Sequence, residues 1–346
     1  MKLRDDVLDW LLEEDNPPVR YLTLTRLLDR PQRSREVVRA KAHLMEYEVT
    51  REILRHGDEF WPGEEWPRSY QKYRGRFWQL IFLGHFLADG RDPGIAEGVQ
   101  KILEARNWIM KIGGQCLTSN VLGAMYKLGY RDEPLVRDGM EDLAEGIVRD
   151  QGLNCDVMNE SLLVQCYMAQ PKLLLCFAQI PPSERSPSVQ SAIAILVKRL
   201  VENEVFIYVP GNKDDWLTVL ATKPKKEDLP RGELVKDWVL EHKAEYLAEH
   251  GPGERHVKAG WAKFGFPLHY NSDALEAMYA LAQVDTPMSP RLEAPLQLIR
   301  DKMTPEGKWK MESSLNGKMW VNVEKKGKPS KWVTFFALST LRHFEA

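Results

Sequence analysis

Four segments of the chain place apolar residues at the same intervals behind a proline. The apolar residues stand two, six and nine places after the proline, and these offsets fall on one face of a helix. Proline suits the first helical position, where its missing N–H has no intrahelical partner to lose. The four prolines are Pro93, Pro134, Pro187 and Pro290. The pattern therefore predicts four helices, each with one apolar face.

A second apolar segment precedes each of these helices, which makes a unit of two helices joined by a short turn. The preceding segments end near Ala88, Leu128, Ala178 and Ala282. The four prolines lie 41, 53 and 103 residues apart, so the last interval covers about two periods and is expected to hold a degenerate unit or an insertion. Two helices in a period of about 50 residues are typical of a stacked helical array.

The rest of the chain extends this helical pattern and interrupts it in three places. Further helices are predicted at 4–14, 18–29, 36–56, 233–249, 273–283 and 331–344. The irregular stretches lie at about 57–76, 204–232 and 304–330, and the last is expected to form a small hairpin. Because the repeat runs over most of the chain, we predict one all-α domain over residues 1–346, with helix pairs around a ring or an arc.

The composition argues against several classes of protein. The 48 Lys and Arg nearly balance the 50 Asp and Glu, which gives no support for a nucleic-acid partner. The acidic start of the chain does not resemble a signal peptide, and no segment reaches the roughly 18 apolar residues of a transmembrane helix. Four cysteines do not make a disulfide scaffold in a chain of this length. We therefore expect a cytoplasmic protein with reduced thiols.

Short segments spread over nearly the whole chain are similar to those of a known superfamily. After the fourth unit the chain reads Thr304-Pro305-Glu306-Gly307-Lys308-Trp309, where the superfamily repeat commonly ends in Gln, Asp, Gly and Trp. Other matching segments are DNPPVRYLTL, FWQLIFL, ADGRDP, CLTSN, LGYRDEP, IPPSERSP, FGFPLHYNSDALEAM and KKGKPSKWVTFFAL. The chain thus resembles the terpenoid cyclase and protein prenyltransferase superfamily, and within it bacterial prenyltransferase or squalene-oxidase repeat proteins.

This resemblance implies an α/α toroid, an α6/α6-type barrel, whose inner helices surround a cavity for an isoprenoid-type ligand. The chain departs from the enzymes of the superfamily in its aspartates. It has no Asp-x-Asp-Asp motif, and its string Asp214-Asp215-Trp216-Leu217-Thr218 lacks the last aspartate of an Asp-Asp-x-x-Asp motif. Three alternatives stay open: a divergent transferase or cyclase, a non-catalytic ligand-binding or scaffold protein, and a carbohydrate-active enzyme, since α/α toroids also host glycosidases and lyases.

Three cysteines and a histidine are candidate metal ligands. Cys116, Cys155 and His269 stand at or just before the starts of predicted inner helices, and Cys166 is expected about two turns into the inner helix that follows Cys155. If all inner helices of a ring run the same way, these starts gather at one end. Three thiolates and one imidazole would then make a tetrahedral zinc site, and protein prenyltransferases hold zinc at the equivalent rim with Asp, Cys and His. Asp156 or Asp273 could replace a ligand. The alternative is that the cysteines pack as small apolar residues.

The remaining candidates concern the ligand and its chemistry. The residues expected to form an aromatic wall suited to a carbocation are Trp78, Trp261, Phe264 and Tyr270. A diphosphate is expected near Lys325, Lys326 and Lys331, which surround a predicted helix start. Asp273 and His269, at the start of the helix predicted at 273–283, are the candidate catalytic residues. The alternatives are ordinary core packing for the aromatic residues and a solvated loop for the lysines.

Overall fold

The computed structural model describes residues 3–57, 71–104, 114–153, 166–208, 214–251 and 255–345. These residues are mostly helical, and each strand among them is two residues long, which confirms the all-α prediction. None of the helices within these ranges has the length and apolar character that crossing a membrane requires. The chain begins with α1 (Asp5–Leu11), α2 (Pro17–Leu22), the π-helical turn η1 (Thr23–Leu27), α3 (Arg35–Ala42), η2 (Leu44–Glu46) and α4 (Glu48–Arg55).

Helix pairs form at all four predicted repeats. They are α7 (Arg76–His85) with α8 (Pro93–Glu104), α10 (Gly114–Lys127) with α11 (Pro134–Arg149), α13 (Ala169–Phe177) with α14 (Pro187–Glu202), and α17 (Ala274–Gln283) with α18 (Glu293–Asp301). Three of the second helices begin at the predicted proline. The fourth differs, because Pro290 opens the 3₁₀ turn η6 (Pro290–Leu292) and α18 follows it. Another 3₁₀ turn, η3 (Pro182–Glu184), precedes α14.

Side chains ahead of the prolines cap two of these helices. The Asp92 carboxylate accepts the backbone N–H of Gly94 at 3.0 Å, and the Ser186 hydroxyl accepts that of Val189 at 3.1 Å. Both bonds satisfy N–H groups that have no partner within the helix. Glu133 makes no such bond at the start of α11. The starts of these two helices are thus determined by capping residues next to the proline, which can be identified in the sequence.

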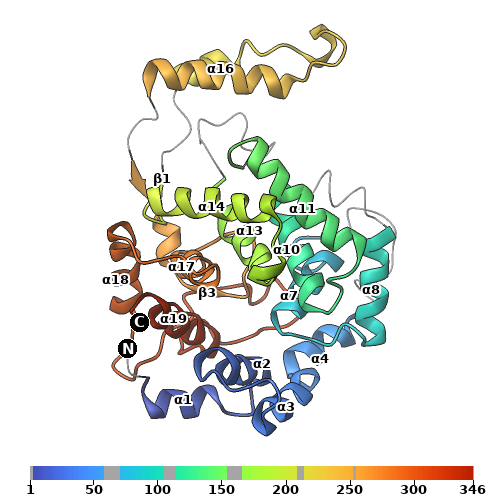
Figure 1. Ribbon diagram of the computed structural model, residues 1–346, viewed down its shortest axis with the longest axis vertical. Helices are drawn as coiled ribbons and strands as arrows, with labels where there is room; N and C mark the ends of the chain where they lie inside the picture. Colours follow the sequence, from blue (N-terminus) through green and yellow to red (C-terminus); the bar gives the residue numbers. More distant parts are fainter. Residues whose placement is uncertain are drawn as a thin grey trace.

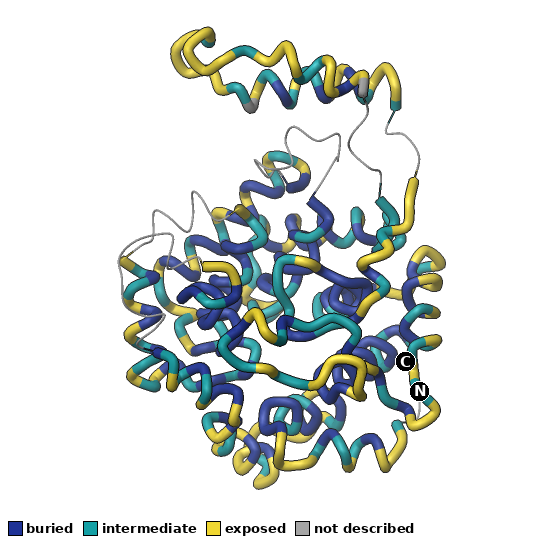
Figure 2. The backbone as a smooth tube through the Cα atoms, turned by 180° about the vertical axis from the view of Figure 1, so that it is seen from behind, coloured by how far each residue is buried: buried dark blue, intermediate teal, exposed yellow. Residues whose placement is uncertain are grey.

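The first helix of each pair is buried along almost its whole length, whereas the second exposes one side (Figure 2). The buried helices pack in chain order: α7 against α10, α10 against α13, α13 against α17, and α17 against α19 (Lys331–Phe344). In turn, α19 packs against α2 and η1 (Figure 1). Each buried helix also contacts the second helix of its own pair. A helix that is apolar on all sides has to be surrounded by other helices, and these two sets of contacts surround it.

The single helix predicted at 36–56 is divided into α3, η2 and α4. Tyr47 lies at the break with an extended ψ of 121°. Its side chain is 5 % exposed and meets the Phe86 ring edge-on, with 5.4 Å between the ring centroids. Tertiary packing of one aromatic residue therefore overrides a helical pattern that is locally consistent.

The segment around the second irregular stretch forms a helical hairpin that stands away from the other helices (Figure 1). It holds α15 (Asp214–Leu220), η4 (Lys226–Asp228) and α16 (Val235–His250). Trp216, Val239 and Tyr246 form a small apolar cluster of its own, and the Tyr246 hydroxyl donates to the Asp215 carboxylate. At its base, β1 (Ile207–Tyr208) pairs antiparallel with β2 (His256–Val257). The single domain over 1–346 stays a prediction.

The last irregular stretch packs against the segment that leads into α17. After the turn η5 (Ala259–Ala262), β3 (Gly265–Phe266) pairs in parallel with β4 (Ser313–Ser314). A Cβ atom on Gly265 would lie 2.6 Å from the Ser313 carbonyl oxygen, so this contact requires glycine. The hairpin predicted at 304–330 is reduced to one antiparallel bridge, between Lys310 and Pro329. This loop pairing positions one wall of the pocket described next.

Candidate functional site

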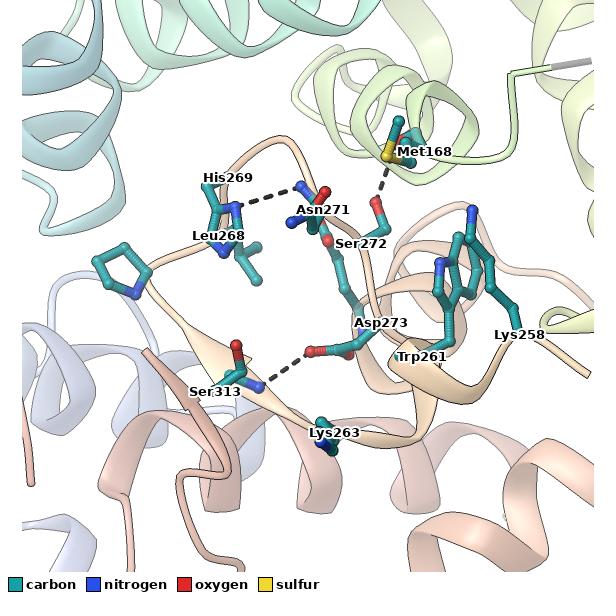
Figure 3. Close-up of a pocket in the computed structure, with 14 residues that line it drawn as sticks. Met168, Lys258, Trp261, Lys263, Leu268, His269, Asn271, Ser272, Asp273 and Ser313 are labelled. Carbon is teal, nitrogen blue, oxygen red and sulfur yellow. Dashed lines mark hydrogen bonds between the residues drawn. The ribbon is translucent and has the colours of Figure 1, made fainter. Parts of the chain in front are cut away.

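A pocket of about 380 Å³ lies at the N-terminal ends of α13 and α17 (Figure 3). Its walls come from the residue before α13, from η5, from the segment between η5 and α17, and from β4. The lining residues are Met168, Lys258, Gly260, Trp261, Lys263, Gly265, Pro267, Leu268, His269, Asn271, Ser272, Asp273, Glu276 and Ser313. Apolar walls with a few polar groups are typical of small-molecule sites.

Asp273 is the buried carboxyl group of this pocket. It caps α17: one carboxylate oxygen accepts the backbone N–H of Glu276 at 2.8 Å, and the other accepts that of Gly265 at 3.0 Å (Figure 3). Burial, helped by the nearby Glu276 carboxyl, raises the pKa of Asp273 to about 7, since both disfavour the charged form. A carboxyl group with a pKa in this range is suited to general acid or base chemistry near neutral pH.

Behind Asp273, a buried ion pair joins the two helices that meet at the pocket. The Lys172 ammonium on α13 bonds to both carboxylate oxygens of Glu276 on α17. Each of these side chains is 1 % exposed. Burial raises the pKa of Glu276, and the Lys172 charge opposes that rise. This pair is not among the residues expected from the sequence, although a single charged residue within each of the apolar runs AQPKLLLCF and ALEAMYALAQ was a visible signal.

His269 faces the same pocket as a neutral imidazole. Burial is the main reason that its pKa falls to about 3, and the Lys172 and Lys72 charges add to the effect. The His269 Nδ1 accepts the backbone N–H of Asn271 at 3.2 Å (Figure 3) and lies 3.4 Å from the Tyr73 hydroxyl. Because Nδ1 accepts, the ring proton is on Nε2. His269 can thus donate a hydrogen bond but carries no charge at neutral pH.

Two lysines give the pocket positive charge. The Lys258 ammonium lies 5.2 Å from the Trp261 ring centroid and 5.6 Å from those of Tyr167 and Tyr208, distances at which cation–π attraction acts. Burial lowers the pKa of Lys258. Lys263 lines the pocket as well. An anionic group entering here would therefore meet two cations beside a tryptophan face.

The metal ligands expected from the sequence are not brought together within the described ranges. Cys155 and Asp156 lie outside these ranges. Cys116 stands near the start of α10, and Cys166 is buried ahead of α13. In the part of the chain that the structure describes, no three His, Cys, Asp or Glu side chains are grouped as a metal site would need. Zinc stays a prediction, without support from the described residues.

A complete Asp-Asp-x-x-Asp spacing occurs at the start of the chain. It was not considered in the sequence analysis, which compared only the string at Asp214 and Asp215 with this motif. Its members are Asp5, Asp6 and Asp9. All three are exposed on α1, and the Asp6 carboxylate lies 2.8 Å from the Arg4 guanidinium. Acidic residues in the first turn suit the positive end of a helix. The string is explained by its place in α1.

One of the four aromatic residues expected to line the ligand cavity lines this pocket. Trp261 lines the pocket. Trp78 and Phe264 are buried, at 0 % and 1 % exposure, and stand outside its lining. Tyr270 is half-buried and packs edge-on against Trp78, with ring centroids 4.8 Å apart. Ordinary core packing thus accounts for the three that do not line the pocket, because large aromatic side chains contribute most to cores.

The lysines expected to bind a diphosphate do not line this pocket, and that site stays a prediction. The Lys331 ammonium bonds to the carboxylates of Glu13, at 2.7 Å, and Asp15. It is buried and already paired, so it does not present a free charge to a ligand. Lys325 and Lys326 are exposed, and neither lines the pocket. The cations that do line it, Lys258 and Lys263, belong to a different segment.

The chain was compared with known proteins in three ways. No protein-family model, no curated protein and no solved structure matches it. The function is therefore inferred from the geometry of the site.

Proposed function

We propose that this protein is an α/α toroid of the terpenoid cyclase and prenyltransferase type, which binds a ligand with an apolar body and an anionic group in the pocket before α17. The chain-order packing of the buried helices, continued from α19 to η1, supports the toroid. An isoprenoid diphosphate is the ligand class that joins these two chemical features.

The observation that carries the proposal is the combination of groups around the pocket. Met168, Trp261 and Leu268 offer apolar surface, and Lys258 and Lys263 offer charge. A volume of about 380 Å³ falls within the roughly 300–1,000 Å³ of known ligand pockets. Burying a hydrocarbon chain contributes about 0.8 kcal/mol for each CH₂ group.

In the enzymatic form of the proposal, Asp273 gives a proton to the ligand. Its pKa of about 7 leaves about half of the carboxyl protonated at neutral pH, and a pKa near the working pH suits a general acid. His269 stays neutral and orients the ligand through its Nε2 proton. The proton moves from the Asp273 carboxyl to the ester oxygen of the diphosphate as the C–O bond breaks, and the diphosphate leaves. The allylic cation that remains loses a proton to give a hydrocarbon. Until it is protonated again, the Asp273 carboxylate keeps the backbone N–H bonds from Gly265 and Glu276.

Non-catalytic ligand binding is the second candidate, and one observation favours it. Both carboxylate oxygens of Asp273 already accept backbone N–H groups, which is what a residue that only caps a helix would do. In that form the pocket binds the same ligand and converts none of it.

Calorimetric titration with farnesyl and geranylgeranyl diphosphate tests the proposal. We expect binding that Lys258→Met weakens by about tenfold, because a charge-assisted contact is lost. Lys326→Met is the matched control, since Lys326 is exposed and outside the pocket, and it should leave the affinity unchanged. Equal effects of both substitutions, or no binding at high micromolar ligand, would refute the proposal.

Product analysis after incubation separates the two candidates. A new hydrocarbon or a released diphosphate that disappears in Asp273→Asn supports catalysis. Non-catalytic binding is supported if the ligand is recovered unchanged, while Lys258→Met still weakens its binding.

A further inference from the structure

A second pocket lies on the other side of Leu268, toward the opposite ends of the buried helices. It has a volume of about 100 Å³, and Leu268 lines both pockets. His85 ends α7, Lys127 ends α10 and Gln283 ends α17, and all three line it. Phe266, Tyr279, Trp332 and Phe336 provide aromatic walls. The segment that leads into α17 thus separates two distinct cavities.

A groove lined partly by exposed residues adjoins this second pocket. The groove has a volume of about 750 Å³ and is lined by residues from α3 and η2 and from the ends of α7 and α10. Leu87 and Lys127 line both the groove and the pocket.

Two cations share the pocket. Arg26 extends from η1 and Lys127 from the end of α10, and within the described ranges no ion pair joins either of them to a carboxylate. Burial is the main reason that the pKa of Lys127 falls to about 8, and the Arg26 charge contributes to this fall. Carbonyl groups at the end of α10 favour one cation there, but they do not account for a second cation beside it.

Neutral hydrogen-bonding groups complete the surroundings. Burial raises the pKa of Tyr279 to about 12, so its hydroxyl keeps its proton and can donate. The buried His85 Nδ1 has no hydrogen-bond partner in the part of the chain that the structure describes. Gln179 and Gln283 add amide groups to the lining. Cations, donors and a small volume together suit an oxyanion.

We propose that this pocket binds a small oxyanion, a phosphate or carboxylate group, between Arg26 and Lys127. A guanidinium binds either group through two parallel N–H bonds, and an ammonium adds a point charge. The anion removes the repulsion between the two cations, so its binding also stabilises the fold. This site is independent of the pocket before α17.

Calorimetry with inorganic phosphate and with acetate, at constant ionic strength and against chloride, tests the site and distinguishes the two sources of oxyanion. We expect saturable binding of at least one of them. Lys127→Gln and Arg26→Gln should each weaken it about tenfold. Arg33→Gln, which removes the same charge from an exposed turn, is the matched control and should bind like the unchanged protein.

Thermal unfolding gives a second readout that does not depend on heat of binding. Without anion, Lys127→Gln should unfold at the same temperature or a higher one, because it removes a partly buried cation that Arg26 repels. With phosphate or acetate, the unchanged protein should gain stability and both pocket variants should not. Stabilisation that is equal in the pocket variants and in Arg33→Gln, or no binding of either anion, would overturn the proposal.

Discussion

Lys172 and Glu276 form an ion pair between α13 and α17 in which each side chain is 1 % exposed. The pair lies directly behind Asp273, whose pKa Glu276 helps to raise. It therefore connects the packing of two buried helices to the proton chemistry of the pocket.

Removing one partner of this pair should destabilise the protein strongly. Glu276→Gln leaves the Lys172 ammonium buried without a counter-charge, and breaking a buried pair in this way costs about 3–5 kcal/mol. Urea denaturation at pH 7 measures the change in the free energy of unfolding.

Two controls make this prediction specific. Lys198→Met removes a partner from the exposed Lys198–Glu202 pair, whose side chains are 74 % and 52 % exposed, and should cost less than about 1 kcal/mol. The double variant Lys172→Met, Glu276→Leu should recover much of the lost stability, because neither charge remains buried. A Glu276→Gln protein as stable as Lys198→Met would show that the pair contributes little.

The raised pKa of Asp273 should appear as a pH dependence of stability. Its folded-state pKa of about 7 exceeds its ordinary value of 3.8, so the folded state holds a proton that the unfolded state has lost between these values. This contribution to stability is complete below about pH 4 and disappears as the pH rises through 7. The slope reaches about 1.4 kcal/mol per pH unit between them.

Asp273→Asn isolates that contribution. Asparagine can still cap α17 but does not titrate, while Glu276, Lys172 and His269 remain in both proteins. The difference in unfolding free energy between the two proteins, measured in urea from pH 4.5 to 8, should change in favour of the asparagine variant as the pH rises. A difference that is constant over this range would place the folded-state pKa of Asp273 near its ordinary value.

The contact between α7 and α10 depends on a glycine. A Cβ atom on Gly84 would lie 2.8 Å from the Cα and Cβ atoms of Ala124. Gly84→Ala forces the two buried helices apart and should destabilise the protein by about 1–3 kcal/mol, despite the better helix propensity of alanine. Denaturant unfolding measures the loss. Gly260→Ala, where no atom lies within 4 Å of the added Cβ, should change stability little; a similar loss in both would contradict the packing argument.

Sequence-based prediction worked where a local signal was sufficient. Pro134 and Pro187 start α11 and α14 as predicted, because a proline and the apolar face behind it act within one helix. The prediction of one continuous helix over 36–56 was wrong. The helix is interrupted at Tyr47, whose side chain packs against Phe86, a residue of another segment. Of the site residues expected from the sequence, Asp273, His269 and Trp261 line the pocket, whereas Lys331 is paired elsewhere.

The sequence by itself determined the helical repeat, because periodicity and helix starts depend on residues within a few positions of each other. Only the tertiary structure decided which charges are paired and which face a cavity. Lys172 and Glu276 are 104 residues apart, and Arg26 and Lys127 come from separate helical units that line one pocket. The free energy of a charge depends on its burial and on its neighbours in space, and neither can be read from positions along a single chain.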